Sequence, residues 1–169
     1  GAFSLMPVTT GPVVDEKERA SWFSHKAEIA TPYYYRVYLA EHDVVAEIAP
    51  TERAAAFRLT YPEKDASYLV IDAYQHGSYV KVIPEKNMVI GYATNNHGGV
   101  PENFRNWFVV VSDTPFETFS VIDGDNVAEG NEVAADHALA MVGFRTKRGQ
   151  EVNLKVASSF ISAEQAELN

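Results

Sequence analysis

The 169-residue sequence contains no cysteine. This absence excludes disulfide bonds, thiolate metal sites and cysteine nucleophiles. It fits an oxidising compartment as well as a reducing one, so cysteine usage does not locate the protein. The hydrophobic content of 46% suits one compact domain with a sizeable core.

Basic residues are also few. The chain has 14 Lys and Arg against 23 Asp and Glu, which gives a formal net charge of -9. Such a surface repels phosphate backbones and anionic lipid headgroups. No apolar stretch approaches the roughly 20 residues of a membrane-spanning helix. We therefore expect neither nucleic acid nor membrane partners.

Motifs for nucleotide binding and acyl transfer are missing as well. There is no P-loop, no dinucleotide-binding glycine fingerprint and no G-x-S-x-G elbow. The five histidines form no i, i+2 or i, i+4 pair that could share a metal. Each is therefore expected to be a surface or locally hydrogen-bonded residue.

Carboxylates also give no clear chemical signal. The segment 123–134 fails as an EF-hand calcium loop, and its Asp123-Gly124 pair is more typical of a hairpin turn. Asp113 and Glu117 could serve as an acid and a base, but ordinary surface charge explains both. We expect no catalytic residue, no metal ligand and no cofactor in this chain.

Short segments rich in β-branched and aromatic residues dominate the sequence. Turn residues separate them at intervals of about 8 to 12 residues, which is typical of a sandwich. In one segment Val152, Leu154 and Val156 alternate with polar residues, so one face meets a core and the other meets water. The fold class is predicted to be all-β, an antiparallel β-sandwich. The predicted strands are 3–8, 33–39, 44–49, 55–61, 68–73, 79–83, 88–93, 106–112, 116–122, 138–145 and 151–157.

One helical signal lies at the end of the chain. Ser162 is a candidate N-cap, and Gln165 follows three residues later, as in a capping box. A helix this short is not stable alone, so we expect the chain to continue into something larger. The chain starts without Met or a leader, which also suggests a fragment. We divide it into a sandwich, residues 1–161, and the start of a linker helix, residues 162–169.

Particular positions narrow the fold further. The segment 23–62 holds a Phe-Ser-His-x-x-Glu start, a proline with two tyrosines, an Ala-Glu-Ile strand and a Thr-x-Arg turn. These are Phe23, Ser24, His25 and Glu28, then Pro32, Tyr34 and Tyr35, then Ala46, Glu47 and Ile48, then Thr51 and Arg53. This order and spacing resembles the N-terminal domain of glycoside hydrolase family 92.

The resemblance extends to both ends. Residues 1–11 are similar to the family's Gly-x-x-x-x-Met-Pro strand, and residues 144–169 resemble its junction with a second domain. Two departures concern loop surfaces. Tyr33 replaces the family's usual glycine, and the segment 95–103 stands where the family commonly has a Gly-Trp-Ala turn.

The resemblance implies a galactose-mutarotase-like supersandwich, incomplete at its N-terminal edge, that precedes an (α/α)₆ catalytic barrel. Family members are mostly exo-acting, calcium-dependent, inverting α-mannosidases, typically α-1,2-mannosidases. Their calcium ligands, acid and base belong to the barrel. This chain would then be non-catalytic and inactive alone, would support the barrel, and would wall part of the mannose site. Its partners would be that catalytic domain and mannose-containing glycans, in a periplasmic or secreted setting.

Three residues are candidates for the surface that faces the substrate or the catalytic domain: His25, Glu28 and His97. His25 either stabilises its own loop through a hydrogen bond to Glu28 or faces the barrel near the sugar.

Two other interpretations of the function stay open. A free-standing carbohydrate-binding or adhesin-type module would need an exposed aromatic platform. An independent hydrolase would need a convergent carboxylate pair in its own pocket. Exposed truncated edges would in addition favour self-association.

Overall fold

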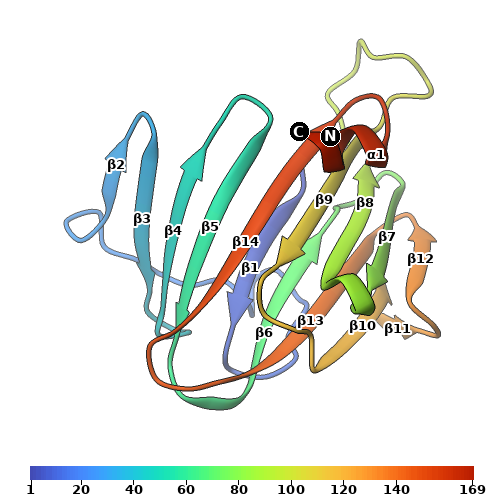
Figure 1. Ribbon diagram of the computed structural model, residues 1–169. Helices are drawn as coiled ribbons and strands as arrows, with labels where there is room; N and C mark the ends of the chain where they lie inside the picture. The colour runs from blue at the N-terminus through green and yellow to red at the C-terminus, as the bar shows by residue number, and fades with distance from the viewer.

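The computed structural model describes all 169 residues, Gly1–Asn169, as two antiparallel sheets and one short helix (Figure 1). The nine-stranded sheet has the order β12 (Glu132–Ala135), β7 (Ser78–Ile83), β8 (Met88–Ala93), β9 (Asn106–Ser112), β14 (Gln150–Ser159), β5 (Ala54–Tyr61), β4 (Val44–Pro50), β3 (Tyr34–Leu39) and β2 (Ile29–Thr31). The five-stranded sheet has the order β1 (Ser4–Val8), β6 (Lys64–Asp72), β13 (Ala138–Thr146), β10 (Thr118–Asp123) and β11 (Asn126–Ala128).

The all-β prediction is confirmed, and each of the eleven predicted strands has a counterpart. Three short strands, β2, β11 and β12, were not predicted, and each of them ends a sheet. All three residues of β2 are exposed, so the strand carries no alternation of buried and exposed residues. Short, exposed edge strands leave no periodic signal in the sequence.

The expected turn and helix signals correspond to observed elements. Asp123 pairs with Asn126 across the β10–β11 hairpin, and Gly124 takes a φ of 59° in its turn. Helix α1 (Ala163–Leu168) begins after Ser162, whose Oγ accepts a hydrogen bond from the Gln165 amide at 3.2 Å. The Gln165 side chain donates to Asn169 instead of to Ser162, so only half of the capping box forms.

The core lies between the two sheets. A cluster of 22 buried residues contains Leu59 and Val110 from the nine-stranded sheet and Leu69 and Val142 from the five-stranded sheet. On the nine-stranded sheet, strands such as β7 alternate buried and half-buried residues. Burial of one row of apolar side chains from each sheet stabilises the sandwich.

The outer face of the five-stranded sheet is covered too. Val8, Val70 and Ile122 form part of a second buried cluster, against which Val13 and Val14 pack from the long connection 9–28. Strand β13 is consequently buried on both faces, and eight of its nine residues are buried. A strand in this environment has a continuous apolar sequence instead of an alternating one.

A buried charged group anchors that connection. The Arg19 guanidinium pairs with Asp72, and both side chains are almost completely buried. Asp72 Oδ1 also lies 2.8 Å from His137 Nε2 and accepts a hydrogen bond from the Tyr74 amide at 2.8 Å. The second guanidinium nitrogen of Arg19 donates to the Val14 carbonyl at 3.0 Å.

The expectation that every histidine is superficial or locally bonded is wrong for His42 and His137. The His42 ring is buried, and its Nε2 lies 2.8 Å from the Arg19 carbonyl oxygen, 23 positions away. The partner of His137 is 65 positions away. Both histidines therefore hold the 9–28 connection and strand ends together, a role that sequence spacing does not reveal.

We predict that Arg19→Met destabilises the protein by about 3–5 kcal/mol, because it leaves the Asp72 carboxylate buried without its main counter-charge. Urea unfolding measures this change. Arg145→Met is the matched control, since it breaks an exposed pair with Glu117 at 3.9 Å and should cost less than about 1 kcal/mol. Equal small losses in the two variants would contradict the anchoring role.

Candidate functional site

Two of the three candidate residues contact each other at the β2 edge. His25 Nδ1 lies 2.7 Å from Glu28 Oε1, and the Tyr35 hydroxyl donates to Glu28 Oε2 at 2.7 Å. The Phe23 ring meets the His25 imidazole edge-on at 5.0 Å between centroids. The hydrogen bonds from His25 and then Tyr35 lower the pKa of Glu28 below its ordinary value of 4.5. His25 nevertheless keeps 82% of its side chain exposed.

His97 lies elsewhere, in the connection 94–105 between β8 and β9. The connection frames a hollow of about 340 Å³ whose lining includes Thr94, Asn96 and Glu102. His97 is exposed and outside that lining. The Phe104 ring of the connection packs 5.7 Å from Phe160, which leads into α1.

The structure does not bring the candidates together. His25 and Glu28 adjoin β2, whereas His97 follows β8, and five strands separate β2 from β8 in the sheet order (Figure 1). With strands about 4.8 Å apart, the two places are more than about 20 Å from each other. A single monosaccharide cannot contact both.

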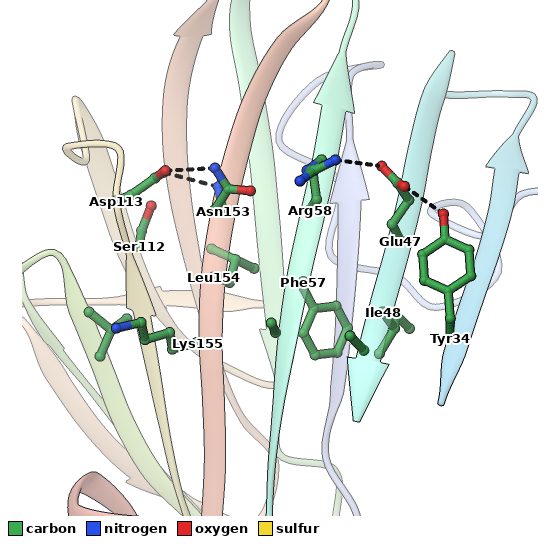
Figure 2. A pocket seen from close by; sticks show the side chains of 13 residues that line it. Tyr34, Glu47, Ile48, Phe57, Arg58, Ser112, Asp113, Asn153, Leu154 and Lys155 are labelled. Atoms are coloured by element: carbon green, nitrogen blue, oxygen red, sulfur yellow. Dashed lines mark hydrogen bonds and ion pairs between the residues drawn. The ribbon is translucent and has the colours of Figure 1, made fainter. Parts of the chain in front are cut away.

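A hollow of about 420 Å³, which was not predicted from the sequence, lies on the outer face of the nine-stranded sheet (Figure 2). On one side the Tyr34 hydroxyl donates to Glu47 at 2.6 Å, and Glu47 lies 3.8 Å from Arg58. The Glu47 carboxylate raises the pKa of Tyr34 through that hydrogen bond. On the other side the Asn153 side chain donates to Asp113 at 2.8 Å.

These polar groups bond to one another instead of converging on a ligand. Asp113 bonds Asn153, while Glu117 faces Arg145, so the carboxylates considered above have separate partners. The sequence signal for this hollow is the set of outward-facing residues that alternate with core residues along β3, β4 and β5. The alternation shows that these side chains share a face of the sheet, but not that a hollow separates them.

A row of aromatic side chains crosses β7, β8 and β9. Tyr79 stacks on Tyr92 at 5.6 Å, Trp107 meets Tyr92 edge-on at 4.9 Å, and Arg105 lies over the Tyr92 ring at 4.9 Å. A sugar platform presents open ring faces, whereas the Tyr92 ring is contacted by Tyr79, Trp107 and Arg105. The row therefore has the geometry of cross-strand pairs that stabilise the sheet.

The positions of the acidic residues show whether the chain could bind a calcium ion. Calcium takes about six to eight oxygen ligands, and no group of three or more His, Asp or Glu side chains is placed to hold a metal. Asp123 belongs to the tight β10–β11 hairpin. The residues present do not fit a calcium site. The only α-helix is six residues long, and no helix has the length and hydropathy for a membrane span.

Comparisons with known proteins identify the fold with a defined enzyme family. The model of the glycosyl hydrolase family 92 N-terminal domain matches residues 1–159. The chain belongs to family 92. No curated protein sequence matches it.

Solved structures agree with this family assignment. An inverting mannosidase of family GH92 from Bacteroides thetaiotaomicron VPI-5482 is 39% identical over 99% of this chain, with a TM-score of 0.92. A second GH92 α-mannosidase from Bacteroides thetaiotaomicron is 26% identical over the whole chain, with a TM-score of 0.90. The chain spans 23% and 25% of those two proteins and corresponds to one part of each.

We predict that His25→Ala raises the pKa of Glu28 towards 4.5, since the first of its two stabilising hydrogen bonds is lost. The lowered pKa means that Glu28 stabilises this family 92 domain above its unfolded-state pKa, and that the contribution disappears as the pH falls through the lowered value. NMR titration of the Glu28 carboxyl carbon measures the change. His97→Ala is the control and should leave Glu28 unchanged. An unaltered Glu28 titration in His25→Ala would refute the contact.

We also predict that millimolar calcium leaves the melting temperature of this family 92 domain unchanged, because no cluster of ligands is available. A ligand that binds the native state stabilises it in proportion to the logarithm of its concentration. Thermal unfolding with calcium, and with magnesium as the control ion, tests this expectation. A rise of several degrees with calcium alone would show that a site exists.

Proposed function

We propose that this chain is the non-catalytic N-terminal sandwich of an exo-acting, calcium-dependent, inverting α-mannosidase. The observation that carries the proposal is the 39% identity, over 99% of the chain, to a structure described as an inverting mannosidase. The geometry adds support, because the carboxylates around the main hollow are engaged with neighbouring side chains. In this proposal the calcium ion and the acid and base belong to the catalytic domain.

The role of the sandwich in such an enzyme is mechanical. An inverting glycosidase holds two carboxyl groups about 6.5–9.5 Å apart with a water between them. That spacing depends on rigid supporting elements. Two sheets that share a close-packed core supply this rigidity, and their loops would wall part of the mannose site.

Of the three candidates, we assign His97 to the surface that faces the catalytic domain. Its connection contacts Phe160, which leads directly into α1. His25 and Glu28 lie at the opposite edge and would face the catalytic domain only if that domain extends across the sheet. We further propose that the enzyme acts on mannose-containing glycans in the periplasm or outside the cell.

The competing function, a free-standing carbohydrate-binding module, is less well supported. It requires an exposed aromatic platform, and the rings of Tyr79, Tyr92 and Trp107 pack against one another. Binding of this chain alone to a mannan on a glycan array would favour the module.

We predict that the whole enzyme hydrolyses an aryl α-mannoside and releases β-mannose first, as inversion requires. Proton NMR of the first-formed anomer measures the stereochemistry. The chain of residues 1–169 alone should release no mannose above the buffer rate. First release of α-mannose would contradict inversion, and turnover by the isolated chain would contradict its non-catalytic role.

A further inference from the structure

A shallow trough runs along the outer face of β4, β5, β14 and β9. Two hollows of about 420 and 460 Å³ share the residues Ala49, Ala56, Lys155 and Val111, which define the floor of the trough. Ala49 pairs with Ala56, Ala56 with Lys155, and Lys155 with Val111, so the four residues form one row across the sheet. The small side chains of Ala49 and Ala56, at one end of this row, leave the depression.

The polar rim of the trough does not suit a small charged ligand. Glu47 is engaged by Tyr34 and Arg58, and Asp113 is engaged by Asn153, as the dashed lines of Figure 2 show. Lys155 forms no ion pair. A mostly apolar floor, surrounded by polar groups that already have hydrogen-bond or ion-pair partners, is typical of a protein interface.

Helix α1 already occupies the neighbouring part of this face. Ala166 is completely buried in a cluster with Met88 and Val109. Ala166 and Asn169 line the second hollow, so the helix forms one wall of the trough. Large apolar side chains beside the helix point to solvent: Phe160, Ile161 and Leu168 are 68%, 78% and 81% exposed. Such a concentration of exposed apolar residues marks an interaction surface.

We propose that the trough and these three side chains form the interface with the polypeptide that follows α1 in the larger family 92 enzyme. The match to the inverting mannosidase covers 99% of this chain but only 23% of that protein, so about three quarters of that protein lies outside the matched domain. Because α1 lies on the trough wall, the polypeptide that continues from it starts on the same face. This inference rests on the proposed function and specifies the surface through which the sandwich supports the catalytic domain.

The absence of cysteine allows a direct test. Ala56→Cys places a single thiol on the trough floor, and Val127→Cys places one on the edge of the other sheet, where the side chain is 71% exposed. Maleimide labelling is followed by peptide mass spectrometry in the whole enzyme and in the isolated chain. In the whole enzyme, Ala56→Cys should react at least about tenfold more slowly than Val127→Cys. In the isolated chain the two rates should be similar.

Equal rates in the whole enzyme would overturn the proposal. Protection of Ala56→Cys that rises with the concentration of the isolated chain would also overturn it, because a second copy would then occupy the trough. Protection by added mannan would assign the trough to a glycan instead. Labelling does not depend on turnover. An enzyme without mannosidase activity but with a protected trough would therefore refute only the proposed function, and an active enzyme with an open trough would refute only this inference.

Discussion

The structure depends on how the chain covers the four faces of its two sheets. The facing sides bury one common core, and the connection 9–28 covers the outer side of the five-stranded sheet. The buried Arg19–Asp72 pair fixes that connection in place. The outer side of the nine-stranded sheet is covered only where α1 packs on β9 and β14. The core is therefore closed by the chain itself, and one broad face remains available.

This arrangement agrees with the proposed supporting role of the domain. The two sheets provide a rigid body, while the carboxylates Glu47 and Asp113 are held by neighbouring side chains. The chain belongs to family 92 and spans 23% and 25% of two GH92 mannosidases of known structure. In the proposed function, the domain would hold the catalytic domain in position at this open face.

Local patterns predicted most of the fold and little of the site. Alternation in β14, the apolar sequence of β13 and the Asp-Gly turn at Gly124 act over a few residues, so the sequence displays them directly. The bonds of Asp72 to Arg19 and His137 join residues 53 and 65 positions apart, and no local pattern encodes them. The trough depends on two alanines and a helix from distant segments. The contact between His25 and Glu28 was foreseeable because it spans three positions.

Because the two sheets share one core, residues 1–169 should unfold as a single cooperative unit. Scanning calorimetry of the isolated chain tests this claim most directly. At about 0.7 kcal/mol per residue, the 169 residues should unfold in one transition with an enthalpy of about 120 kcal/mol at the midpoint. The calorimetric and van't Hoff enthalpies should agree. A broad, non-cooperative transition would contradict the account, because packing between the two sheets would then not be enough to hold the core together.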